Sequence, residues 1–285
     1  MLNTEKGSII SFKKTFLTMR IKPLTIILMG LILTLPLNAQ KRKGETGNEP
    51  LFGKDLASYT VASDKLAGAT FYLVSGHGGP DPGAMGLYQG RPLYEDEYAY
   101  DIILRLAREL MMRGAKVHII IQDKKDGIRE DRILPGSERE TCMGKAIPLK
   151  QTERLHQRAA KINELYRQDK SKYKRAIFIH VDSRSESKQT DVYFYHANGS
   201  KGGKRLADNL RKTFTAKYQK HQPGRGFTGT VSARNLYVLR NTSPVGVFLE
   251  LGNICNKQDQ KRLVLPSNRQ ALARWIADGI EADYK

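Results

Sequence analysis

The regular pattern of the chain begins with Thr70-Phe71-Tyr72-Leu73-Val74-Ser75-Gly76-His77-Gly78-Gly79. The first six of these residues are rich in β-branched and aromatic side chains, which predicts a short strand over 70–75. The glycines that follow predict a tight turn directly after this strand, with His77 inside it. A glycine loop that cradles phosphate is the alternative interpretation, but the spacing matches neither nucleotide-binding fingerprint.

Strand and helix patterns alternate along the rest of the chain. Apolar residues at three- and four-residue steps predict helices over 95–113, 152–168, 201–218 and 268–282. Short apolar runs predict strands over 116–121, 176–181, 190–195, 235–240 and 245–250. This alternation predicts an α/β fold, a single three-layer domain with a mostly parallel sheet flanked by helices on both faces.

Two segments do not follow the alternation. Residues 40–67 lack strong periodicity and are predicted to form a linker and N-terminal extension before a domain over 68–285. Residues 122–150 are rich in charge and contain two prolines, which predicts an irregular insertion in that domain. The two cysteines, Cys142 and Cys255, lack the spacing of a metal site, and the sequence leaves open whether they pair or stay independent thiols.

The first 39 residues have the layout of a secretory signal peptide. Basic residues precede an apolar run from Leu24 to Leu35, and we expect cleavage near Ala39. Met19 is an alternative start of translation, which would give a signal peptide of more ordinary length. The run is shorter than the ~20 residues of a membrane span, which favours a removed signal over a permanent anchor. The predicted location is the periplasm or cell envelope after export, with no permanent membrane span in the mature form.

The chain beyond residue 39 is strongly basic, with 43 basic and 28 acidic side chains. Such a charge suits anionic polymers such as the cell wall or lipopolysaccharide. Nucleic acid would be attracted by charge as well, but export and the lack of a nucleic-acid motif argue against it.

Three polar residues occur at the ends of predicted strands: His77, His180 and Glu250. In open α/β sheets the carboxyl ends of parallel strands meet at one crevice, so these side chains are predicted to converge. Two imidazoles and one carboxylate are typical of catalytic zinc sites, which leave a fourth position for water. A buried Glu250 needs a cation, a metal-bound water or a salt bridge, which Arg234 or Arg240 could supply.

The start of the 95–113 helix offers a further carboxylate for the metal. Glu95 lies on the inward stripe of this helix, whereas Glu97 shares a face with Asp101 and is predicted to point outward. Glu95 is therefore the predicted ligand, and Asp96 and Glu97 are expected merely to complement the helix dipole. Structural or surface roles are predicted for the remaining histidines, His118, His156, His196 and His221.

Four motifs together resemble the zinc-dependent N-acetylmuramoyl-L-alanine amidase family. They are Ser75-Gly76-His77-Gly78-Gly79 followed by Asp81-Pro82-Gly83-Ala84, Glu95 at the helix start, Ile179-His180-Val181-Asp182-Ser183, and Leu249-Glu250-Leu251-Gly252 with Asn256 close behind. Order and spacing agree over about residues 69–284. The resemblance implies a six-stranded sheet and one Zn²⁺ ion held by His77, Glu95 and His180.

The implied reaction is hydrolysis of the amide between N-acetylmuramic acid and L-alanine in peptidoglycan, with Glu250 as general base. Peptidoglycan is the expected partner, together with a possible activator protein. The chain departs from the family at Asp182, where an asparagine is usual, and at Asn253, where an aromatic residue is common. Together with Arg234, these two residues are predicted to contact the substrate. The alternatives are another exported zinc hydrolase, such as a carboxypeptidase or deacetylase, and a non-catalytic cell-wall-binding domain.

Overall fold

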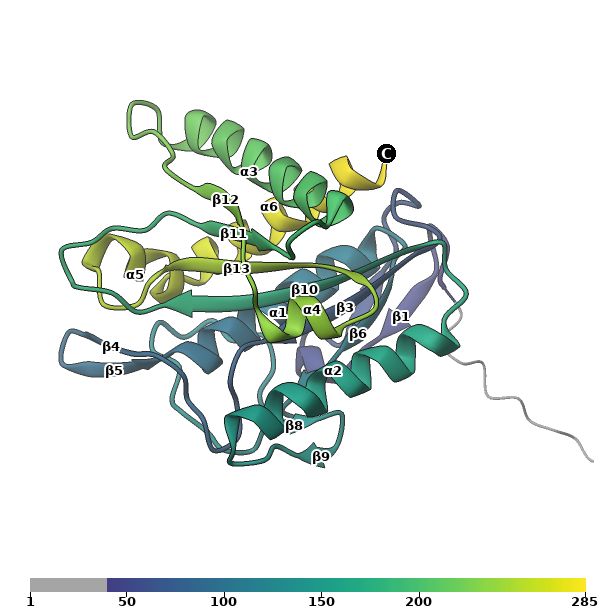
Figure 1. Cartoon of the computed structure of the whole chain (residues 1–285), viewed down its shortest axis with the longest axis horizontal. Coiled ribbons are helices and arrows are strands. Elements are labelled where there is room, and N and C mark those ends of the chain that lie inside the picture. The colour runs from purple at the N-terminus through teal and green to yellow at the C-terminus, as the bar shows by residue number, and fades with distance from the viewer. Residues whose placement is uncertain (1–39) are drawn as a thin grey trace, which may run out of the picture. The chain divides into compact units, whose positions relative to one another are not determined.

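A six-stranded sheet in the order β12-β11-β13-β10-β3-β6 forms the centre of residues 40–285, the part of the chain that the computed structural model describes (Figure 1). Its parallel strands are β3 (Ala69–Ser75), β6 (Lys116–Ile119), β10 (Tyr173–Asp182) and β13 (Val245–Asn253). The remaining two, β11 (Tyr193–His196) and β12 (Thr230–Ala233), run antiparallel to them. This confirms the predicted α/β fold with a mostly parallel sheet of six strands. The predicted signal peptide lies outside the described residues.

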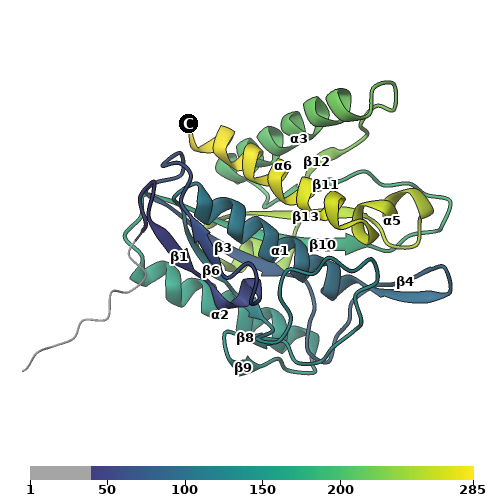
Figure 2. The same ribbon diagram turned by 180° about the vertical axis from the view of Figure 1, so that it is seen from behind.

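Helices cover both faces of this sheet, as Figures 1 and 2 show from opposite sides. One face is covered by α1 (Glu95–Met112), α3 (Lys201–His221) and α6 (Pro266–Tyr284). The short helix α5 (Lys257–Val264) lies beside α6. The other face is covered by α2 (Gln151–Gln168) and α4 (Tyr237–Asn241). Alternate residues of β3 enter the two cores: Phe71 and Leu73 face the α1 side, and Tyr72 and Val74 the α2 side. Burial on both faces explains the unbroken apolar run of this strand.

The strand predicted over 235–240 is wrong, because Tyr237–Asn241 forms helix α4. The strand of this region lies earlier, at Thr230–Ala233, on the mostly exposed edge of the sheet. A short apolar run does not distinguish a strand from one helical turn. An exposed edge strand also lacks the apolar side chains by which a buried strand is found.

A β-hairpin leads into helix α1. Strands β4 (Met85–Tyr88) and β5 (Arg91–Tyr94) pair antiparallel around Gln89 and Gly90. Both turn residues have positive φ, 51° and 76°, as a type I′ turn requires. The hairpin ends at Tyr94, so the first residue of α1 is Glu95.

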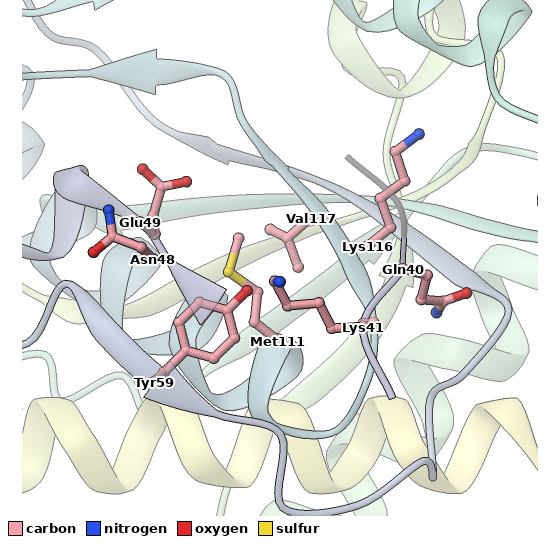
Figure 3. A pocket seen from close by; sticks show the side chains of 9 residues that line it. Gln40, Lys41, Asn48, Glu49, Tyr59, Met111, Lys116 and Val117 are labelled. Carbon is pink, nitrogen blue, oxygen red and sulfur yellow. The ribbon is translucent and has the colours of Figure 1, made fainter. Parts of the chain in front are cut away.

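Residues 40–67, predicted to form a linker and N-terminal extension, pack against the domain. β1 (Thr46–Asn48) and β2 (Ser58–Thr60) pair antiparallel, and the 3-10 helix η1 (Pro50–Phe52) lies between them. Phe52 and Leu66 are buried in the core on the α1 side. Figure 3 shows the pocket between this segment and the start of β6, lined by residues that include Glu49, Tyr59 and Lys116. It lies at the opposite end of the parallel strands from His77, since Lys116 pairs with Thr70.

The insertion contains more regular structure than predicted. Three short strands, β7 (Ile121–Gln122), β8 (Thr141–Cys142) and β9 (Lys145–Ala146), form a small antiparallel sheet. Cys142 is buried in this sheet and Cys255 is half-buried; both thiols are free. Among residues 40–285, no helix combines the length and the apolar character needed to cross a membrane.

Candidate metal centre

His77 lies in a turn where two glycines make room for the neighbouring side chains. A Cβ atom at Gly76 would lie 2.3 Å from Cε1 of His180, and one at Gly83 would lie 2.7 Å from Oε2 of Glu95. His77 itself has a φ of 55°, which is uncommon for a residue other than glycine. The glycine-rich turn therefore brings the imidazole of His77 against residues from β10 and α1.

His77, Glu95 and His180 form one group whose donor atoms all lie within 4.8 Å of one another. The Nε2 atom of His77 lies 3.2 Å from Oε2 of Glu95, and Nδ1 of His180 lies 2.8 Å from Oε1 of the same carboxylate. Ligands at ~2.0–2.1 Å around a tetrahedral zinc ion are separated by roughly 3.4 Å, so these separations suit a shared cation. The structure thus brings together the three residues predicted to be ligands.

Glu95 is held by backbone groups from the loop before β4 and from strand β10. Its carboxylate accepts hydrogen bonds from the backbone N–H of Ala84 at 2.8 Å and of Val181 at 3.0 Å. Burial alone would raise the pKa of Glu95, but hydrogen bonds from His180 and His77 outweigh it and hold this pKa far below its usual range. The carboxylate is therefore ionised, as a metal ligand must be.

Asp81, Arg154 and Arg158, which were not predicted as site residues, surround His77 and fix its position. Nδ1 of His77 lies 2.8 Å from Oδ2 of Asp81, and Arg154 of α2 donates to the same oxygen at 2.6 Å. Arg158, one helical turn later, donates to the backbone carbonyl of His77. Burial opposes charge on His77, but the hydrogen bonds to Asp81 and Glu95 raise its pKa to about 9. The hydrogen bond with His77 lowers the pKa of Asp81 to about 2.

Glu250 lies beside this group on the neighbouring strand. The parallel register of β10 and β13 pairs His180 with Glu250, and both side chains face the α2 side of the sheet. Phe248 faces the same side, and its ring stacks on that of His180 with the centroids 4.2 Å apart. The Oε2 atom of Glu250 is inaccessible and has no hydrogen-bond partner among residues 40–285. In the described part of the chain, neither Arg234 nor Arg240 forms an ion pair with Glu250. The alternative of a structural salt bridge is therefore not supported.

The charges of this site fit a bound cation. Burial, and then the negative charges of Glu95 and Asp182, raise the pKa of Glu250 to about 9. Without a metal ion, the positive charge that faces these carboxylates is the proton held by His77, which a bound metal would displace. A divalent ion among His77, Glu95 and His180 would supply that charge, and this donor set is one that zinc accepts.

Asp96 and Glu97 are buried, which corrects the outward orientation predicted for Glu97. Their exposed fractions are 3% and 1%, and they lie with Glu140 in a second group of carboxylates within 4.8 Å of one another. Arg129 pairs with Glu97 at 2.7 Å, and Glu140 accepts a hydrogen bond from the N–H of Gly79. The insertion over 122–150 covers this face of α1, which the helical pattern by itself does not reveal.

Comparisons with known proteins agree with this arrangement. A family model described as N-acetylmuramoyl-L-alanine amidase matches residues 72–282. The chain belongs to this amidase family. All four residues of the site, from His77 to Glu250, fall inside the matched range.

Relatives of this amidase include a germination-specific N-acetylmuramoyl-L-alanine amidase of Bacillus subtilis, 26% identical over 223 residues that cover 75% of this chain and 79% of that protein. An uncharacterized cell wall amidase of Bacillus anthracis is 26% identical over 228 residues; the match covers 77% of this chain but only 36% of the relative. Among solved structures, the CwlD amidase from Clostridioides difficile, in complex with the GerS lipoprotein, has a TM-score of 0.56 at 21% identity. That match covers 75% of this chain and 98% of CwlD, and it supports the fold.

The three residues predicted to contact the substrate, Asp182, Asn253 and Arg234, differ in their exposure to solvent. Asp182 forms an ion pair with Arg184 near Glu250. Asn253, also predicted to contact the substrate, is fully buried. Its amide instead holds the 184–188 loop through the N–H of Arg184 and the carbonyls at 185 and 188. Arg234 is exposed, with its guanidinium 4.8 Å from the ring centroid of Tyr195.

Proposed function

We propose that this chain is a zinc-dependent N-acetylmuramoyl-L-alanine amidase that cleaves the bond between N-acetylmuramic acid and L-alanine in peptidoglycan. The observation that carries the proposal is the convergence of His77, Glu95 and His180 beside a carboxylate, Glu250, that has an unpartnered buried oxygen. Membership in the amidase family supports the same bond.

Each residue has a role that its surroundings support. His77 would bind zinc through Nε2, because Nδ1 faces Asp81, and His180 through Nδ1, which faces Glu95. When bound, zinc supplies Lewis-acid chemistry, since it polarises a carbonyl oxygen and makes water a stronger acid. Glu250 then accepts the proton of the attacking water and delivers it to the nitrogen of the departing L-alanine. The positive ion next to Glu250 favours the ionised carboxylate that this role needs.

Export and partners belong to the same proposal. We place the mature protein in the periplasm or cell envelope, because residues 1–39 have the pattern of a signal peptide. An activator protein is a reasonable partner, since the CwlD amidase was solved in complex with a lipoprotein.

Digestion of purified sacculi tests the bond and the metal together. The zinc-loaded protein should release intact stem peptides with a free L-alanine amino terminus, which mass spectrometry identifies. A chelator should abolish this release, and added zinc should restore it. A Glu250→Gln variant should bind zinc with unchanged stoichiometry and lose at least ~10²-fold in rate, as expected when a general base is removed.

The rival functions give different products in the same digestion. Shortened stems would indicate a carboxypeptidase, and deacetylated sugars would indicate a deacetylase. Binding to sacculi without any new product would indicate a cell-wall-binding domain. An active Glu250→Gln variant would exclude Glu250 as the base while leaving the bond assignment intact.

A further inference from the structure

Two arginines lie one strand away from the proposed base, on the same face of the sheet. Strand β11 runs beside β13, and its register places Tyr193 opposite Glu250. The guanidinium carbon of Arg184 lies 5.3 Å from the ring centroid of Tyr193, and that of Arg234 lies 4.8 Å from the ring centroid of Tyr195. The two tyrosine rings stack with centroids 5.9 Å apart, so they form a continuous support for both cations.

Arg234 differs from the other arginines that lie over aromatic rings in residues 40–285. It has no carboxylate partner in those residues, although its side chain is exposed beside the site. The others each pair with an aspartate: Arg175, Arg184, Arg225, Arg262 and Arg269. The structure therefore holds Arg234 in place through an aromatic ring and leaves its charge free for a ligand.

Arg184 also keeps capacity for a ligand. Its Nε atom pairs with Asp182, whereas its two terminal nitrogens have no hydrogen-bond partner among residues 40–285. The side chain is 37% exposed. Its backbone N–H donates to the buried Asn253, which fixes the start of the loop that carries it. Four N–H donors of this guanidinium thus remain available on a fixed backbone.

The spacing matches the stem peptide. Neighbouring strands lie about 4.8 Å apart. Arg184 lies over the ring of Tyr193, and Tyr193 is on the strand next to that of Glu250. One extended peptide residue spans roughly 3.5 Å, which puts the carboxylate of the second stem residue about 7 Å from the cleaved amide. The two guanidinium groups lie over Tyr193, directly opposite Glu250, and over Tyr195, two residues further along β11.

We propose that Arg184 and Arg234 bind carboxylates of the stem peptide and make the enzyme selective for stems whose second residue keeps a free carboxylate. This inference rests on the proposed amidase function. A guanidinium group donates paired hydrogen bonds to a carboxylate. Compared with the carboxylate, an amide at this position has no negative charge and one acceptor oxygen fewer. Its N–H₂ group also faces the N–H groups of the arginine, which are donors as well. Stems amidated at the second residue therefore bind more weakly.

Two muropeptides that differ only in this group, one with D-glutamate and one with its α-amide at the second position, test the selectivity. For the parent protein we expect a KM about 10-fold lower for the acid, because a charge-assisted hydrogen bond contributes roughly a factor of 10 to 100. Arg234→Gln and Arg184→Gln should each raise the KM of the acid about 10-fold, toward that of the amide, with kcat changed less than twofold. Arg234→Lys should give an intermediate KM. Arg211→Gln, at an exposed position of α3, is the matched control.

A direct binding measurement keeps this inference separate from the catalytic assignment. Calorimetry with the dipeptides L-alanyl-D-glutamate and L-alanyl-D-isoglutamine needs no turnover, so it decides the selectivity even for a protein that cleaves neither muropeptide. Tighter binding of the acid that both arginine variants abolish supports the inference. The inference is overturned if the parent protein binds the acid and the amide with equal affinity. It is also overturned if the variants weaken the binding of both dipeptides equally. Cleavage that yields products other than intact stems overturns the amidase assignment instead.

Discussion

The Oδ2 atom of Asp81 lies 2.8 Å from Nδ1 of His77 and leaves Nε2 of that ring directed toward Glu95. A carboxylate in this position fixes the tautomer of a metal-binding histidine and raises its basicity, and its loss commonly weakens metal binding 10- to 100-fold. Arg154 holds the same oxygen, so the orientation depends on helix α2 as well.

Asp81→Asn should therefore weaken zinc binding by about 10- to 100-fold. Competition with a fluorescent chelator measures this affinity. The exposed Asp55→Asn is the control and should leave the affinity unchanged. An Asp81→Asn protein with parental affinity would show that Asp81 does not orient the ring of His77.

Glu95 and Glu97 lie two residues apart, and their variants should fail in different ways. Glu95→Gln should lose stoichiometric zinc, because the carboxylate between His77 and His180 is removed. Glu97→Gln should keep zinc and weaken the attachment of the insertion, because it breaks the ion pair with Arg129. Zinc content and proteolysis of the insertion distinguish the two, and zinc loss in both variants would contradict the assignment.

Asn253 should control the loop that carries Arg184. Asn253→Ala removes the side-chain amide that bonds to the backbone at 184, 185 and 188, and the expected loss of stability is about 2–4 kcal/mol. Trypsin should then cut after Arg184 and Lys188 faster than in the parent protein. Asn235→Ala, at an exposed position, is the comparison. An unchanged cutting rate would mean that other contacts hold the loop.

The N-terminal segment should contribute to the stability of the domain. Phe52 is 1% exposed in the core beside α1, and Phe→Ala changes at such positions cost about 3–5 kcal/mol. Urea unfolding of Phe52→Ala should show a loss of this size in the same single transition. A change below ~1 kcal/mol would support the linker predicted from the sequence.

Asp169 should make stability depend on pH in the acid range. Burial would raise its pKa, but hydrogen bonds from Lys116 at 2.8 Å and from Ser171 at 2.8 Å lower it to about 2. Because this folded-state pKa lies below the usual 3.8, the stabilisation is present above pH ~4 and disappears as the pH falls through about 2.

Asp169→Asn should therefore lower the free energy of unfolding by about 1–2 kcal/mol at pH 7 and by much less at pH 2.5. Denaturant unfolding at the two pH values measures the difference. Asp131→Asn, at an exposed position, should show no such change. An equal loss at both pH values would assign the effect to packing and hydrogen bonding instead of charge.

The strands buried on both faces, and the polar residues at their ends, could be predicted from the amino-acid sequence alone. Val74 and Phe178 lie in continuous apolar runs, which are typical of strands buried on both faces. The parallel core was therefore predictable. His77 and His180 follow from the same logic, because parallel strands bring their carboxyl ends together whatever the strand order.

The groups that surround these residues depend on how distant segments fold together. Arg154 and Glu140 reach the His77 turn from two such segments, and no local period in the sequence marks a contact of this kind. The burial of Glu97 depends on the insertion folding over α1, and that of Asn253 depends on the 184–188 loop closing over it. Local sequence sets backbone preference and the apolar pattern, whereas the partner of a polar group is set by whichever segment folds against it.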